Sequence, residues 1–126
     1  MFKEVMISII IIVLIFSLDI ITQTYTMASV AETSSELNNL KGKIENQNNN
    51  LDIDIDKISN NWEKRRQKLS YFIEHDELEK VETCLTNIRS NIETEELEHS
   101  IENLDTCIFI LEHIRDKEKL SLANIF

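Results

Sequence analysis

The amino-acid sequence predicts an all-α protein: an N-terminal transmembrane helix followed by a small antiparallel helical bundle with a coiled-coil-like hairpin. The chain has no Pro and one Gly, Gly42, so residues that break helices and shape hairpin turns are almost missing. Residues 5–21 form an apolar run with a single charge, Asp19, and later apolar residues recur at helical spacing. We therefore expect an anchor at residues 1–27 and a helical domain at residues 28–126.

The apolar run is long enough to cross most of a bilayer. Seventeen residues at about 1.5 Å each extend roughly 26 Å, a little less than the ~30 Å hydrocarbon core. Thr22 is then expected at the far interface, where Asp19 can reach water. A cleaved signal peptide is the alternative, because Lys3 precedes the run and residues 29–31 resemble a cleavage site. The length of the run and the distance to that site favour an uncleaved anchor.

The charges around the run predict that the bundle lies outside the cell. Lys3 stands before the run, whereas the first charged residues after it are acidic. We expect a single-pass protein of the cell membrane with a cytoplasmic N terminus. The residues after the run hold 12 Lys or Arg and 21 Asp or Glu, so this domain should be repelled by anionic lipid and nucleic acid. No nucleic-acid partner is expected.

Apolar spacing divides the outer domain into helices at about residues 30–45, 52–73, 76–93 and 95–115, followed by an apolar tail. Thr33 and Glu36 form a candidate capping box for the first of these helices. Residues 46–50 indicate a linker, because Asn side chains compete for backbone hydrogen bonds and tolerate left-handed geometry. A phase slip over residues 71–77 predicts a kink near His75.

The last two long helices are expected to form an antiparallel hairpin. Leu and Ile residues between positions 97 and 111 repeat at steps of four and three, which is the most regular heptad stripe of the chain. Only a short segment around Thr94 separates this stripe from the preceding helix, which favours a tight reversal. A reversal about Thr94 places Cys84 level with Leu104.

The two cysteines are candidates for a disulfide. Cys84 and Cys107 fall at equivalent heptad positions beside the seam of the predicted hairpin. Outside the cell they can form a disulfide that closes a loop of about two dozen residues and adds roughly 3 kcal/mol. The alternative is a pair of small, buried, free thiols.

The histidines suggest a weaker candidate site. His75 and His113 are equidistant from Thr94 in the predicted hairpin, with Glu112 nearby as a further ligand for a metal ion. In the heptad frame they flank the seam without converging, so we assign no metal. A pairing of His75 with Glu112 is favoured instead.

Two segments are candidate partner contacts. Trp62 opens the one basic cluster, which includes Arg65 and Arg66 and can either bind an acidic partner or form a solvated face around a packed Trp62. The apolar tail must be covered, either by the Trp62 region of the bundle or by another protein. Its apolar residues include Leu120, Leu122, Ile125 and Phe126.

Several segments together resemble a known family. They are Trp62 ahead of a basic helix, residues 72–78, residues 111–114 and residues 118–126. Over essentially its whole length the chain is similar to the domain of unknown function 4363 family, small proteins of clostridial-type, spore-forming bacteria with an N-terminal membrane segment and a helical remainder. The resemblance implies no activity. It implies an accessory role beside small YetF-like membrane proteins, next to which members are often encoded.

These observations predict a binding module rather than an enzyme. No nucleophile with a base, phosphate-cradling loop or pair of converging carboxylates can be assembled from the pattern. We expect a non-enzymatic module of the cell envelope without a cofactor, which binds the bilayer through residues 5–21 and another envelope protein through its outer domain. Homo-oligomerisation stays open. The alternative is a metal or ligand sensor that uses His75 and His113.

Overall fold

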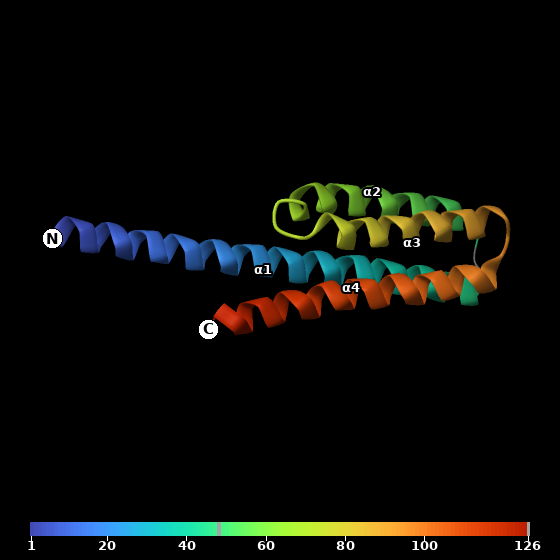
Figure 1. Cartoon of the computed structure of the whole chain (residues 1–126). Coiled ribbons are helices and arrows are strands. Elements are labelled where there is room, and N and C mark those ends of the chain that lie inside the picture. The colour runs from blue at the N-terminus through green and yellow to red at the C-terminus, as the bar shows by residue number, and fades with distance from the viewer. Residues whose placement is uncertain (48, 126) are drawn as a thin grey trace.

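Four helices form an up-and-down bundle from which the first helix extends (Figure 1). The computed structural model describes residues 1–47 and 49–125, with the backbone alone over residues 121–125. Consecutive helices pack against each other and α4 packs back on α1, which closes the bundle. The predicted all-α fold is confirmed. Its helices are α1 (Phe2–Glu45), α2 (Leu51–Leu69), α3 (His75–Glu93) and α4 (Leu97–Ile125).

Helix α1 joins the apolar run to the bundle without a break. The sequence predicts a separate helix that starts near residue 30 with a capping box at Thr33 and Glu36, but the structure has one helix across this region. Thr33 lies inside it, and its Oγ1 donates to the carbonyl oxygen of Ser29 at 2.8 Å, as mid-helix threonines do. Because no Gly or Pro occurs in residues 2–41, no helix breaker stops α1 at the edge of the apolar run.

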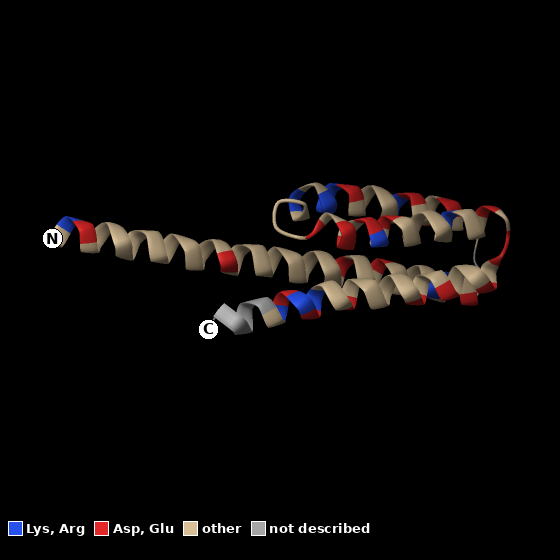
Figure 2. Ribbon diagram, viewed as in Figure 1, with Lys and Arg blue, Asp and Glu red and all other residues tan. Residues whose placement is uncertain are grey.

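The two halves of α1 have different surroundings. The N-terminal half contains a stretch with a mean hydropathy of 2.8, none of it buried, and by length and composition α1 is the one described helix able to cross a membrane. Figure 2 shows few charged residues on this half. The C-terminal half forms one side of the bundle. Its buried residues are Thr26, Ser29, Val30, Thr33, Leu37, Leu40 and Ile44.

The turn between α1 and α2 uses left-handed backbone conformations. Gln47 and Asn50 have φ values of 56° and 68°. Asn tolerates this region better than most residues because its short polar side chain can hydrogen-bond locally. The linker predicted at residues 46–50 therefore lies where the sequence placed it.

Residues 70–74 reverse the chain between α2 and α3. The sequence predicts a kink near His75 after a helix that reaches residue 73, but α2 ends at Leu69 and the chain turns back completely. The N–H groups of Phe72 and Ile73 both donate to the carbonyl oxygen of Leu69, at 3.0 and 2.8 Å. The side chains of Phe72 and Ile73 pack on the core. The phase slip in the sequence thus marks the turn at which the chain reverses direction between α2 and α3.

A Schellman motif ends α3. The N–H of Glu95 donates to the carbonyl oxygen of Ile92 at 3.2 Å, and the N–H of Glu96 donates to that of Asn91 at 2.8 Å. Glu95 has a φ of 58°, a left-handed conformation that glycine usually provides at this position. Because Glu95 has a Cβ atom, this left-handed conformation costs more free energy here than it would with glycine.

This turn shifts the register of the α3–α4 hairpin. The hairpin itself forms as predicted, but α4 begins at Leu97, so the reversal is centred beyond Thr94. Cys84 consequently interacts with Cys107, nearly one helical turn along α4 from the expected Leu104. The extra residues in the Schellman turn account for the displacement.

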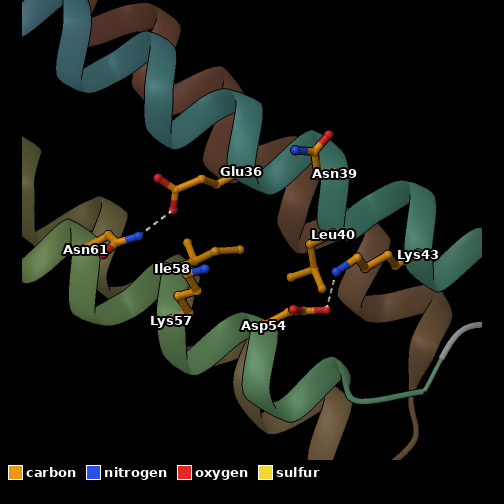
Figure 3. A pocket seen from close by; sticks show the side chains of 8 residues that line it. All are labelled: Glu36, Asn39, Leu40, Lys43, Asp54, Lys57, Ile58 and Asn61. Atoms are coloured by element: carbon orange, nitrogen blue, oxygen red, sulfur yellow. Dashed lines mark hydrogen bonds and ion pairs between the residues drawn. The ribbon is translucent and has the colours of Figure 1, made fainter.

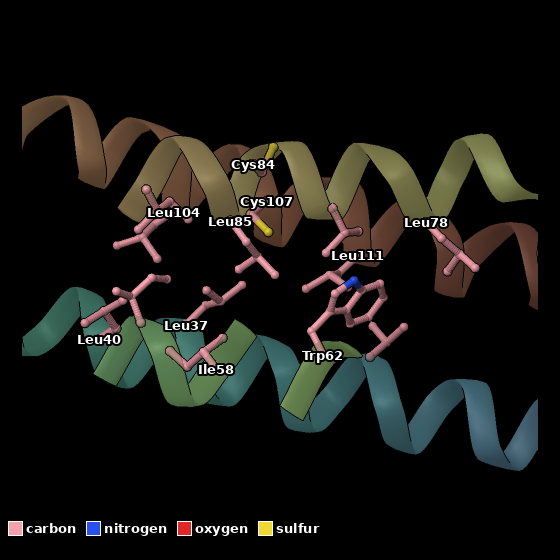
Figure 4. Packing of buried hydrophobic residues seen from close by; sticks show 14 of the residues in the cluster. Leu37, Leu40, Ile58, Trp62, Leu78, Cys84, Leu85, Leu104, Cys107 and Leu111 are labelled. Atoms are coloured by element: carbon pink, nitrogen blue, oxygen red, sulfur yellow. The ribbon is translucent and has the colours of Figure 1, made fainter. Parts of the chain in front are cut away.

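A single hydrophobic core fills the bundle (Figure 4). Trp62 is its largest fully buried side chain, at 1% exposure, and points between the helices toward Leu111. The predicted stripe of α4 is rotated slightly from the core: Leu104 and Leu111 are fully buried, whereas Ile101 and Ile108 are only partly so. The buried positions of α4 are Ser100, Leu104, Cys107, Leu111 and Ile114.

Candidate functional site

Aromatic and apolar side chains gather where the bundle meets the exposed half of α1. We call this region the proximal end and define it by Tyr25, Lys68, Tyr71, Phe72 and Leu120. Tyr25 and Phe72 meet edge to face with ring centroids 6.4 Å apart, and Lys68 Nζ lies 5.7 Å from the centroid of the Tyr25 ring. Tyr71 is 88% exposed and Leu120 is 65% exposed. The proximal end therefore combines a packed aromatic pair with exposed apolar surface.

A cavity of about 170 Å³ opens beside the proximal end between α3 and α4. Glu77 on its wall is buried, and its Oε2 has no hydrogen-bond partner among the described groups. Lys117 Nζ lies 3.3 Å from Glu74 Oε2 and 3.9 Å from Glu77 Oε1. Burial raises the pKa of Glu118, and the charge of Lys117 partly opposes this shift. Lys117 thus pairs the C-terminal part of α4 with the carboxylates at the start of α3.

A larger groove of about 350 Å³ runs between α1 and α2 (Figure 3). Leu40 contributes to its apolar lining. Lys43 Nζ donates to Asp54 Oδ2 at 2.9 Å, and Asn61 Nδ2 donates to Glu36 Oε2 at 3.4 Å, so both contacts cross from one helix to the other. These polar groups hold α1 and α2 together rather than converge on a ligand.

Cys84 and Cys107 are buried free thiols on neighbouring helices (Figure 4). A hydrogen bond from Cys107 lowers the pKa of Cys84 to about 7, because it stabilises the Cys84 thiolate. The same hydrogen bond, together with burial, raises the pKa of Cys107. The hairpin thus brings the two cysteines together as the sequence predicts, with the disulfide still a prediction.

His75 and His113 both lie on the surface of the bundle. His75 Nε2 lies 2.9 Å from Glu79 Oε1, one turn further along α3, instead of pairing with Glu112 as the sequence suggests. His113 is exposed. Across the residues that the structure describes, no group of three or more His, Cys, Asp or Glu side chains is arranged to hold a metal ion.

The basic cluster of α2 contributes to the bundle itself. Trp62 is buried in the core, which matches the packed alternative and removes its side chain from any contact surface. Arg65 Nη1 donates to Thr33 Oγ1 at 2.8 Å. Arg65 Nη2 also lies 3.0 Å from Glu32 Oε2 and 2.7 Å from Glu36 Oε1. Arg65 therefore joins α2 to α1, whereas the sequence predicted either a partner contact or a solvated face for this cluster.

Arg66 makes the equivalent connection to α3. It donates to both carboxylate oxygens of Glu63, at 2.8 and 3.2 Å, and forms an ion pair with Glu82. The Glu63 hydrogen bond is the main cause that raises the pKa of Arg66. The sequence could not reveal how either arginine joins two helices, because Glu36 and Glu82 lie on helices other than α2.

The apolar tail continues α4. The sequence predicts a helix that ends near residue 115 and a tail that folds onto the Trp62 region or another protein, but α4 reaches Ile125 and runs beside α1 (Figure 1). Leu120 is exposed. The side chains of Leu122 and Ile125, and Phe126 as a whole, lie outside the described residues. The helix therefore carries the tail away from Trp62.

Phe109 is an exposed aromatic residue within a stretch that the sequence pattern assigns to the core. It is 69% exposed, while its neighbours Ile108 and Ile110 are partly buried against the core. A run of apolar residues from 107 to 111 resembles continuous core, yet five successive helical positions cannot all face one side. The helical period alone therefore predicts that at least one residue of this run is exposed, and the structure shows that Phe109 is such a residue.

The fold defines a small up-and-down four-helix bundle whose first helix extends as an apolar rod. The family model for DUF4363, a domain of unknown function, matches residues 20–125. The chain belongs to this family, which confirms the resemblance seen in its sequence. No curated protein and no solved structure matches the chain.

Proposed function

We propose that this protein is a membrane-anchored, non-enzymatic accessory module of the cell envelope that binds another membrane protein. The observation that best supports this function is the continuity of α1. One half of this helix is apolar and unburied, and the other half forms a side of the bundle. A continuous helix is stiff, so it holds the bundle at a set height and orientation relative to the membrane.

The charge pattern supports an outward-facing bundle. Lys3 precedes the apolar run, and basic residues are retained on the cytoplasmic side of membrane helices. The bundle would then stand on the outer face of the cell membrane, beside the extracytoplasmic parts of other membrane proteins.

Phe109 is the proposed anchor for the protein partner. It projects from α4 with 69% exposure, and polar residues such as Asp105 and Glu112 flank it on the same helix. An aromatic side chain with a polar surround is the type of residue that dominates binding at protein interfaces. The partly buried Ile108 and Ile110 fix this part of α4 on the core. A YetF-like membrane protein is the partner class that the family resemblance suggests.

The ion pairs between helices support a non-enzymatic role. Arg65, Arg66 and Lys117 each bind carboxylates of a neighbouring helix, so these charged groups stabilise the bundle. A catalytic site would need charged or nucleophilic groups directed at a shared space instead.

Photo-crosslinking in native membranes tests the contact. A benzophenone amino acid at position 109 should crosslink a membrane protein, and Phe109→Ser should reduce recovery of that protein from detergent extracts. Ile53, 66% exposed on α2, is the matched control, and Ile53→Ser should leave recovery unchanged. Equal recovery with both variants would refute the Phe109 surface. Release of the protein from membranes by alkaline carbonate would refute the anchor.

A further inference from the structure

The ion pair between Lys41 and Asp105 shows which residues of α1 and α4 lie level. Lys41 Nζ is 2.8 Å from Asp105 Oδ1, and the two helices run in opposite directions. The same number of residues separates Lys41 from Thr26, toward the start of α1, and Asp105 from Leu120, toward the end of α4. Thr26 and Leu120 therefore lie level with each other. The last residues of α4 therefore lie level with the end of the apolar run.

The turn between α2 and α3 reaches the same level. Phe72 in this turn packs edge to face with Tyr25 of α1, and Lys68 Nζ lies over the ring of that tyrosine. Tyr71, next in the chain to Phe72, is 88% exposed, more than any other aromatic side chain that the structure describes in the bundle. Three separate segments thus bring apolar and aromatic groups to one height along α1.

This height corresponds to the lipid headgroups. Tyr25 follows Ile21, the last residue of the apolar run, by four positions, which is about 6 Å along a helix. The headgroup layer on each side of the hydrocarbon core is roughly 5–8 Å thick. When residues 5–21 span the core, the proximal end therefore falls within the headgroup layer.

Resting on the proposed membrane anchoring, we propose that the proximal end is a lipid-contacting surface: Tyr71, Phe72 and Leu120 insert into the headgroup layer. The bundle then sits directly on the membrane with its long axis upright. Tyr rings favour this layer because one end is apolar and the other polar, and Lys side chains reach from it to water. Leu120, which is 65% exposed, gains a cover that the bundle itself does not give.

The contact is apolar and aromatic rather than electrostatic. Lys68, Lys117 and Lys119 lie at or near the proximal end together with Glu74, Glu77 and Glu118, so the charges there largely offset each other. The contact therefore needs no anionic lipid and should form on phosphatidylcholine.

The acidic surplus of the domain lies away from the membrane. Figure 2 shows acidic residues at the connection between α3 and α4, at the opposite end of the bundle. Glu45 near that end follows Tyr25 by twenty residues, or about 30 Å, which exceeds the ~8 Å Debye length. In the upright orientation these charges are therefore screened from the membrane, and repulsion from anionic lipid arises only when the bundle tilts its distal end toward the surface.

Depth-dependent fluorescence quenching tests the proposal on the full chain in phosphatidylcholine nanodiscs that hold one copy each. Single cysteines are introduced by Ile12→Cys, Tyr71→Cys, Leu120→Cys and Thr94→Cys and labelled with an environment-sensitive dye. The parent protein, labelled in parallel, reports any reaction at the buried Cys84 and Cys107. Lipids with a nitroxide on the headgroup and iodide in the buffer serve as quenchers.

The labels at positions 71 and 120 should be quenched by the headgroup nitroxide and lose most of the iodide quenching seen at position 94, the distal control. A second copy cannot shield them in these nanodiscs. Iodide quenching at 71 and 120 equal to that at 94, with position 12 shielded from iodide, would overturn the lipid contact while the anchor stands. Iodide quenching at position 12 as well would overturn both the anchor and the contact. Circular dichroism of each labelled variant confirms that helical content is kept.

Discussion

The guanidinium of Arg65 and the carboxylate of Glu36 lie 2.7 Å apart, between Nη2 and Oε1, and join α2 to α1. The Arg65 side chain is only 16% exposed and also donates to Thr33 Oγ1. Because this arginine is mostly shielded from water, its hydrogen bonds to charged groups contribute more than those of a surface ion pair. It is a structural residue placed close to the start of the bundle.

Loss of Arg65 should weaken the bundle. We expect Arg65→Met to lower the free energy of unfolding by about 1–3 kcal/mol, because Glu36 and Thr33 lose their charged partner. Urea unfolding followed by circular dichroism measures the change. Lys64→Met, at the exposed neighbouring position, should change stability by less than about 0.5 kcal/mol. Equal effects of the two substitutions would contradict the role of Arg65.

Local patterns predict much of this fold. The absence of Pro and the heptad spacing predict the helices, and the Asn-rich segment predicts the first turn, because these features depend on neighbouring residues. The partners that Arg65 finds on α1 and Arg66 finds on α3 could not be predicted, since an ion pair between helices depends on register and rotation. The approach of Cys84 and Cys107 was predicted from their heptad positions, but their relative level depends on the Schellman turn.

Trp62 should be a residue of the core and not of a partner surface. We expect Trp62→Ala to reduce stability by about 3–5 kcal/mol, because it leaves a large cavity at a fully buried site. Tyr71→Ala, at an 88% exposed position, should have little effect on the free energy of unfolding in detergent. Chemical denaturation followed by circular dichroism compares them. A native-like stability for Trp62→Ala would show that the indole is not packed.

The Schellman turn offers a stabilising substitution. Glu95 has a φ of 58°, so Glu95→Gly should raise the free energy of unfolding by about 0.5–1 kcal/mol through relief of the left-handed strain. Glu96→Gly is the control. Glu96 does not have a positive φ, so its substitution should not raise the free energy of unfolding. Thermal unfolding of both variants decides the question, and a destabilised Glu95→Gly variant would contradict the turn geometry.

Oxidation should link Cys84 to Cys107. With oxidised dithiothreitol as the two-electron acceptor, the Cys84 thiolate attacks the reagent and Cys107 then displaces it, leaving a disulfide and the reduced reagent. Because the pKa of Cys84 is lowered to about 7, the rate of the first step, attack by Cys84 on the reagent, should rise as pH increases through 7 rather than through the usual thiol range near 8.5. The closed loop should add about 3 kcal/mol of stability.

Mass spectrometry under non-reducing conditions identifies the product by the loss of two hydrogen atoms within one chain. Thermal unfolding before and after oxidation measures the stabilisation. Cys84→Ala should abolish both effects. Formation of disulfide-linked dimers in place of the internal bond would show that the two thiols do not meet in the folded bundle.

Glu118 should make stability depend on pH near the proximal end. Burial raises the pKa of this carboxyl above its unfolded value of 4.5, so the folded state favours the protonated form. The stability that this group contributes is fully present below the unfolded pKa and is lost as pH rises through the folded pKa, where the partly buried carboxyl must become charged.

Glu118→Gln removes the cost of charging this carboxyl, so the variant should melt at a higher temperature than the parent at pH 7, and the difference should shrink toward pH 4. Glu112→Gln, at an exposed position of the same helix, should leave the melting temperature nearly unchanged at both pH values. A Glu118→Gln variant that melts below the parent at pH 7 would show that the attraction of Lys117 for the carboxylate outweighs its burial.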